Sequence, residues 1–374
     1  MERALLRTSS HLANDQRRPF GPGDLSRSEH LECVCADGAA SAARWVSSPR
    51  LRWRTCYHRG VDVNNPTGST GLVAIDKRGS HALFLDPTTY QELGRLALTA
   101  RPHEIAISAD HQLAYVSIYG LGVYGNNDQP GNTIVVLDLA SREQVGEIDL
   151  SPYVAPHGLM FGADDLLYAS CDASGVVAVV DCEQGEIVGT IDAESTGAHM
   201  IAMLPDGSKL YSENEEDRFV GVMDPVSQRM IAKIPLPGGA AGISSSADGS
   251  QVLVVTLDEP GLAVIDTTTD RLVRRLRLDG STIAAQRVRC NPNGQYVVVT
   301  NNDESLVTVL DAGLTRQTTF PVSKAPMGVA FHPDGRTALV GNHGAGKITV
   351  VDLEAAAPVR EFEAGIGVET LAFY

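Results

Sequence analysis

A histidine recurs at the same place in three similar stretches of the chain. The stretches are Arg101-Pro102-His103-Glu104, Ala155-Pro156-His157-Gly158 and Gly197-Ala198-His199-Met200, and later copies lack the histidine. Imidazole nitrogens bind divalent cations and transfer protons near neutral pH. Three of them in successive copies of one repeat predict a ring of side chains that face a common axis, where a metal ion can bind.

The elements that carry these histidines are short β-branched segments separated by turn residues, from Gly71 onward. They repeat at intervals of roughly 40 to 50 residues, which is typical of propellers. Each unit is predicted to contain a strand, an Asp-Gly or Asn-Gly type of turn, a second strand, a variable loop, a third strand ending in aspartate and a polar fourth strand. The seven aspartates are interpreted as structural, because a carboxylate that begins a turn accepts backbone N–H bonds. They are Asp86, Asp138, Asp181, Asp224, Asp266, Asp311 and Asp352.

The first unit lacks its first strand, and the chain ends with a segment, Val368–Tyr374, that matches a first strand and nothing more. Pairing the two closes the ring without a free sheet edge. The sequence therefore predicts an all-β fold over residues 61–374. This fold is a seven-bladed β-propeller of four-stranded blades, with the first blade closed by the C-terminal strand. Residues 1–60 have no sustained period and are predicted to be an irregular N-terminal extension, either loosely ordered or packed on the outside of the main domain. A role as a basic interaction arm is the functional alternative.

Two second strands carry a family resemblance. Tyr296-Val297-Val298-Val299-Thr300-Asn301 and Ala114-Tyr115-Val116-Ser117 resemble the Tyr-Val-Thr-Asn repeat of the surface-layer and lactonase-like propeller superfamily. The resemblance covers residues from about 71 to 374. It implies a seven-bladed propeller and several activities, since the superfamily includes lactone hydrolases, a cycloisomerase, a metal-dependent lyase and non-catalytic binding proteins.

Alignment of the first strands assigns one residue of each blade to a ring position. Going round from the shared blade, these residues are Glu369, His103, His157, His199, Ala241, Gln286 and Met327. Histidine and carboxylate sets of three or four ligands are common for Zn, Fe, Mn and similar ions. We therefore predict that His103, His157, His199 and Glu369 bind a divalent metal ion. The alternative is that the histidines are turn elements that hydrogen-bond to neighbouring blades.

A second layer is expected at the ends of the second strands, around the mouth of the channel. It comprises Lys77, Tyr119, Asp172, Glu215, Asp258, Asn302 and His343. Glu215 and His343 are the candidate acid–base residues, with a low pKa expected for Glu215 beside a cation. Tyr119 begins a glycine-rich insertion, residues 119–131, that can serve as a lid or substrate wall. Solvated rim positions are the alternative interpretation.

Arg287 directly follows the ring position of its blade. An arginine at the edge of a channel can hold a substrate carboxylate or an oxyanion. Pairing with Asp258 or another acidic residue is the alternative. Tyr119, Glu215, Arg287 and His343 together are the predicted catalytic residues.

Composition excludes several classes of protein. The formal net charge of −16 disfavours nucleic acid and anionic membrane surfaces as partners. No apolar segment approaches the 18 residues of a membrane helix, and the N-terminus does not resemble a secretory signal. Six scattered cysteines favour a reduced, cytoplasmic setting. The motifs of serine hydrolases, P-loop proteins and zincins are absent from the sequence.

These observations predict a metal-dependent enzyme that acts on a small-molecule substrate at the mouth of the channel. Lactone ring opening by a hydrolase, or a related lyase or isomerase step, is the expected class of reaction. Two alternatives remain open. One is an oxidoreductase with histidine-ligated iron or copper, and the other is a non-catalytic propeller that binds a protein or a ligand on its top face.

Overall fold

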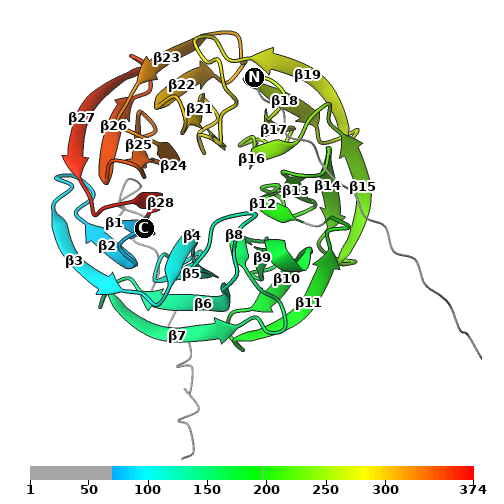
Figure 1. The fold of residues 1–374 in the computed structure, drawn as a ribbon, viewed down its shortest axis with the longest axis vertical. Helices are drawn as coiled ribbons and strands as arrows, with labels where there is room; N and C mark the ends of the chain where they lie inside the picture. The colour runs from blue at the N-terminus through cyan, green and yellow to red at the C-terminus, as the bar shows by residue number, and fades with distance from the viewer. Residues whose placement is uncertain (1–69, 196) are drawn as a thin grey trace, which may run out of the picture. The chain divides into compact units, whose positions relative to one another are not determined.

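The computed structural model describes residues 70–195 and 197–374. Seven antiparallel sheets of four strands each stand in a ring, which confirms the predicted seven-bladed propeller (Figure 1). The predicted N-terminal extension, residues 1–60, lies outside the described residues. Within them, no helix is both long enough and apolar enough to cross a membrane.

The strands occupy four concentric positions. The innermost strands are β28 (Val368–Phe373), β4 (Arg101–Ile107), β8 (Pro156–Phe161), β12 (Ala198–Met203), β16 (Ala240–Ser245), β20 (Arg287–Cys290) and β24 (Pro326–Phe331). The second strands are β1 (Leu72–Asp76), β5 (Leu113–Gly120), β9 (Leu167–Cys171), β13 (Leu210–Asn214), β17 (Gln251–Thr256), β21 (Tyr296–Asn301) and β25 (Thr337–Asn342). The third strands are β2 (His81–Leu85), β6 (Pro130–Asp138), β10 (Val176–Asp181), β14 (Phe219–Asp224), β18 (Gly261–Asp266), β22 (Leu306–Asp311) and β26 (Lys347–Asp352). The outer strands are β3 (Glu92–Ala97), β7 (Glu143–Asp149), β11 (Glu186–Asp192), β15 (Arg229–Pro235), β19 (Arg271–Arg277), β23 (Gln317–Pro321) and β27 (Ala357–Glu363), and one 3-10 helix, η1, spans Asp172–Ser174.

The two ends of the propeller meet in the first blade. Strand β28 pairs with β1 in an antiparallel register in which Leu371 lies opposite Ala74. This confirms that the C-terminal strand supplies the missing first strand. The ring is therefore held closed by hydrogen bonds between residues that lie about 300 positions apart in the chain.

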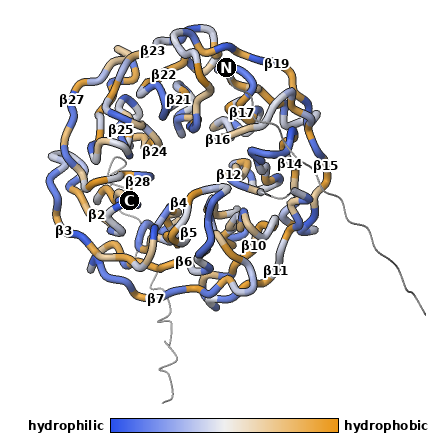
Figure 2. The backbone as a smooth tube through the Cα atoms, in the orientation of Figure 1, coloured by the Kyte–Doolittle hydropathy of each residue, from blue (hydrophilic) through white to orange (hydrophobic). Residues whose placement is uncertain are grey.

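The hydrophobic core lies between neighbouring blades. One cluster, for example, joins Met200 and Val222 of the fourth blade to Ile243 and Ile265 of the fifth. The second and third strands are buried on both faces, so their sequences are almost continuously apolar. The outer strands have one solvated face, and hydrophilic and hydrophobic residues alternate along them (Figure 2).

The aspartates that end the third strands have the predicted structural role. Each of the seven accepts at least one hydrogen bond from a backbone N–H of the turn that follows. Asp311, for example, accepts from Thr315 at 2.7 Å. The carboxylate thus satisfies backbone donors that have no strand partner.

Candidate active site

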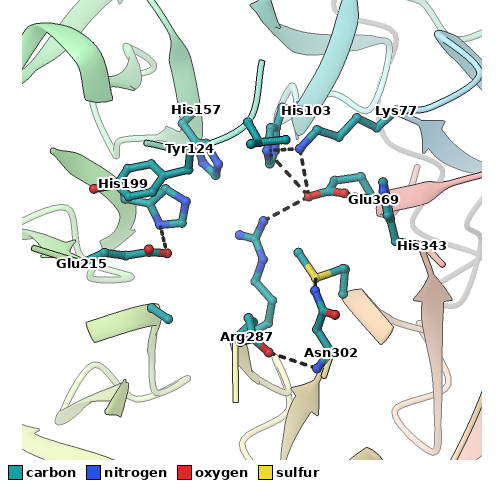
Figure 3. A pocket seen from close by; sticks show the side chains of 14 residues that line it. Lys77, His103, Tyr124, His157, His199, Glu215, Arg287, Asn302, His343 and Glu369 are labelled. Carbon is teal, nitrogen blue, oxygen red and sulfur yellow. Dashed lines mark hydrogen bonds and ion pairs between the residues drawn. The ribbon is translucent and has the colours of Figure 1, made fainter. Parts of the chain in front are cut away.

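The three histidines lie in irregularities at the start of their strands. Strand β4 pairs with β5 at Pro102 and again at Ile105, so that His103 and Glu104 have no paired residue in β5. The same two-residue irregularity includes His157 in β8 and His199 in β12. A bulge of this kind turns a side chain away from the regular alternation. Here it directs the histidines of three neighbouring blades into the channel (Figure 3).

A cavity of about 270 Å³ opens at this end of the channel. Its lining contains all seven residues of the predicted ring together with Glu215, Arg287 and His343 from the predicted catalytic set. The full lining is Lys77, His103, Val123, Tyr124, His157, His199, Glu215, Ala241, Gln286, Arg287, Asn302, Met327, His343 and Glu369. Tyr119, Asp172 and Asp258 are not part of it.

The histidine rings form a tilted stack. The ring centroids of His103 and His157 lie 3.9 Å apart, and those of His157 and His199 lie 4.0 Å apart. Burial, reinforced by the charge of Lys77, lowers the pKa of His103 to about 4. Burial also holds the pKa of His157 well below its usual value. Both imidazoles are therefore neutral at pH 7, which is the form that binds metal ions.

Two ring nitrogens in this stack are buried without a partner. Among the described residues, Nδ1 of His103 and Nδ1 of His157 have no hydrogen-bond partner. His103, His157 and the buried Glu104 each offer one ligand atom, and these atoms lie within 4.8 Å of one another. This cluster could hold a metal ion. His199 and Glu369, the other two predicted ligands, lie outside this group of three.

His199 is held by carboxylates on its own blade. Its Nδ1 lies 2.7 Å from Oε1 of Glu213 and 3.7 Å from Oε1 of Glu215. Burial acts to lower the pKa of His199, but the two carboxylates outweigh it and the pKa is raised. Burial raises the pKa of Glu215 to about 7. This raised pKa, in the protein without a cation, is opposite in direction to the low pKa that is expected from the sequence for Glu215 beside a bound cation.

Glu369 is surrounded by positive or protonatable groups. Its carboxylate lies 2.8 Å from Nδ1 of His343, 3.5 Å from Nζ of Lys77 and 3.7 Å from Nη2 of Arg287. Burial opposes its ionisation, but Lys77, His103 and His343 keep the pKa of Glu369 well below its usual value. Glu369 is therefore an ionised residue whose charge is already shared among its neighbours.

Arg287 pairs with an acidic residue across the channel. Its Nη2 lies 2.7 Å from Oε1 of Glu104, and its Nη1 lies 2.7 Å from Sδ of Met200. Asp258, the partner considered from the sequence, binds Arg275 instead. Glu104, Met200 and Arg287 come from the second, fourth and sixth blades, so their contacts span the channel.

The glycine-rich insertion contributes a different tyrosine from the one predicted. Tyr119 is buried behind the stack, where its ring makes edge contacts with His103 and His157. Tyr124 lines the cavity, lies edge-on to His199 and donates a hydrogen bond to Glu216. The insertion thus reaches the cavity through Val123 and Tyr124, as a substrate wall would.

Two acidic residues of the site, Glu104 and Glu213, were missed in the prediction. In the second and third blades, the hydroxyls of Ser117 and Ser170 each accept a hydrogen bond from the backbone N–H of the residue after the ring histidine. Each hydroxyl also donates to the backbone carbonyl of the ring residue in the next blade. Glu213 occupies the same place in the fourth blade, where it binds the backbone N–H of Met200 and the ring of His199. The sequence has glutamate where the two preceding repeats have serine, and this difference could have identified Glu213 as a site residue.

Comparisons with known proteins support the fold. No family model and no curated protein matches the chain. Among solved structures, hydrazine synthase from Kuenenia stuttgartiensis is similar with a TM-score of 0.60 and 17% identity, over 72% of this chain and 89% of that chain. Dihydro-heme d1 dehydrogenase NirN is similar with a TM-score of 0.59 and 14% identity, over 82% of this chain and 75% of that chain. Both neighbours are enzymes, and at these identities the likeness shows a shared propeller fold.

Proposed function

We propose that the protein is a metal-dependent enzyme that acts on a small organic molecule in the cavity at the channel mouth. The observation that carries the proposal is the pair of buried, neutral histidines, His103 and His157, whose Nδ1 atoms have no hydrogen-bond partner among the described residues. A buried polar atom without a partner costs about 1–3 kcal/mol. A cation held by His103, His157 and Glu104 would remove this cost, with His199 beside it.

The chemistry follows from the groups that share the cavity. A divalent cation polarises a carbonyl oxygen or lowers the pKa of a bound water molecule. Glu215 lines the same cavity, 3.7 Å from His199, and its carboxylate can accept a proton from a bound molecule and return it. His343, held beside Glu369, is a second proton carrier on the opposite wall.

The resemblance to lactonase-like propellers favours a lactone as the substrate. In the ring-opening step, a water oxygen bonds to the carbonyl carbon while Glu215 takes one proton of that water. The ring C–O bond then breaks, and the released oxygen takes the proton from Glu215 to complete a hydroxy acid. A lyase or isomerase step would use Glu215 in the same way, to move a proton between substrate atoms.

An oxidoreductase with histidine-ligated iron or copper is the second candidate. Neutral imidazoles suit both metals, and one structural neighbour is a dihydro-heme d1 dehydrogenase. Spectra of the iron- or copper-loaded protein and its oxygen consumption separate this candidate from the first. A non-catalytic propeller would turn over neither class of substrate.

Elemental analysis of the purified full chain tests the proposal, followed by calorimetric titration of the EDTA-treated protein with Zn²⁺, Fe²⁺ or Mn²⁺. We expect one divalent ion per chain and an affinity at least about tenfold lower in His103→Ala and His157→Ala. His332→Ala, which changes a histidine outside the cavity, is the matched control. Binding that is absent, or equal in all the folded variants, contradicts the proposal. Hydrolysis of a panel of small lactones then tests the reaction.

A further inference from the structure

Two hydrogen-bond donors among the residues that line the cavity have weak acceptors. Nη1 of Arg287 lies 2.7 Å from Sδ of Met200, and Nδ2 of Asn302 lies 3.3 Å from Sδ of Met327. Both residues line the cavity (Figure 3). A thioether sulfur is a poor acceptor, whereas an ionised oxygen makes roughly twice as strong a hydrogen bond as a neutral one. Both donors would therefore gain from an anionic oxygen in the cavity.

The guanidinium of Arg287 is held in a fixed orientation. Arg287 is 6% exposed, and its Nη2 is bound by Glu104 at 2.7 Å, with Glu369 at 3.7 Å. These contacts occupy one side of the planar group and leave Nη1 beside the sulfur. A donor that is already immobilised loses little conformational freedom when a ligand binds.

The charges around Arg287 also favour an anion. Glu104 and Glu369 are the acidic groups, and they are matched by Arg287, Arg289 and Lys77. The remaining carboxylates, Glu213 and Glu215, lie by His199 and also interact electrostatically with Arg287. Around Arg287 an anion would therefore meet three cationic side chains beside these two carboxylates, in a chain whose formal net charge is −16.

We propose that Arg287 and Asn302 bind the carboxylate of the substrate, with Nη1 and Nδ2 donating to its oxygens. The inference rests on the proposed function for the reaction and adds the class of molecule, a small carboxylic acid whose reacting carbonyl faces the histidines. The planar fork of arginine matches a carboxylate. The volume of about 270 Å³ lies below the usual range of pockets for drug-sized ligands, which suits a small acid.

Titration calorimetry with matched probes tests this inference on the full chain, both EDTA-treated and zinc-loaded. The probes are pyruvate and malonate, and their uncharged counterparts are pyruvamide and malonamide. We expect the acids to bind at least about tenfold more tightly than the amides. Arg287→Met and Asn302→Ala should each lose about tenfold or more in affinity for the acids. Arg289→Met, which also removes a contact to Glu104 but lies outside the cavity lining, should keep the affinity.

Equal affinity for acids and amides, or unchanged affinity in both variants, overturns the inference. If Arg287→Met fails to fold by circular dichroism, Asn302→Ala decides, because the side-chain amide of Asn302 contacts only a sulfur within the described part of the chain. Metal content of the same samples separates the two proposals. Zinc binding without a preference for acids overturns the inference alone, and a preference for acids without metal binding overturns the proposed function alone.

Discussion

Among the neighbouring side chains, Glu213 has the largest effect on the pKa of His199. Glu213 is fully buried, and its Oε1 both accepts the backbone N–H of Met200 and lies 2.7 Å from Nδ1 of His199. In the second and third blades a serine fills this place, and the carboxylates of Glu104 and Glu369 lie no closer than 3.6 Å to the ring nitrogens of His103. The stack thus combines two imidazoles whose pKa is lowered with a third whose pKa is raised, although the three residues are chemically alike.

Replacing Glu213 with glutamine should lower the pKa of His199. The amide keeps the size of the side chain but removes the negative charge that stabilises the imidazolium, so burial dominates and the pKa falls below the ordinary value of 6.5. NMR titration of the histidine Cε1–H signals of EDTA-treated protein measures this change. Glu216→Gln, which alters a carboxylate bound to Tyr124, is the control and should leave His199 unchanged. A His199 pKa that stays raised in Glu213→Gln would contradict the assignment.

At the level of elements, the residue that directly follows the ring position in each first strand is alternately large and small from the second blade to the seventh. Glu104, Met200 and Arg287 meet across the channel, and glycines stand between them in the ring. A Cβ atom on Gly242 would lie 3.0 Å from Cα of Arg287, so the glycine allows the next first strand to approach. The bulged first strands therefore present the histidines and also pack tightly against one another around the axis.

Gly328→Ala tests this packing. A Cβ atom at Gly328 would overlap the carbonyl oxygen of Glu369 and lie 2.7 Å from Cα of Thr370, so β28 must shift. We expect the free energy of unfolding to fall by about 1–3 kcal/mol, measured by urea denaturation. Gly313→Ala is the control, because its nearest neighbour would be at an ordinary 3.7 Å. Equal stability of the two variants would show that the close approach at Gly328 is unimportant.

At the level of the whole propeller, one strand both closes the ring and completes the site. Strand β28 joins the first blade through β1 and carries Glu369, which contacts His343 of the seventh blade and Lys77 of the first. The strand that closes the ring therefore also supplies a side chain of the cavity. A chain without β28 would leave the edge of β1 unpaired.

A chain that ends at Glu363 should consequently fail to form the closed propeller. We expect a loss of cooperative thermal unfolding and a tendency to associate through the open edge, measured by circular dichroism and size-exclusion chromatography. Val359→Ser, which changes an exposed residue of the outer strand β27, is the control and should unfold like the full chain. A monomeric truncated protein with unchanged cooperative unfolding would contradict this view of closure.

The sequence by itself determined the number of blades, the order of strands and the closing pair. Each of these depends on local patterns that recur, namely apolar strands, Asp-Gly turns and the aspartates after the third strands. The cavity lining also contains all seven positions of the ring predicted from the aligned first strands. A repeat brings equivalent residues to equivalent places, so alignment alone could identify His103, His157 and His199 as neighbours.

Only the tertiary structure decided how these residues are paired. Arg287 binds Glu104 rather than Asp258, and Tyr124 rather than Tyr119 reaches the cavity. These outcomes depend on side-chain directions across the channel and on the path of an insertion that has no counterpart in the other blades. Neither the side-chain directions nor the path of the insertion follows from the period of the repeat. The repeat predicts which residues face the axis, and packing and charge determine which of them meet there.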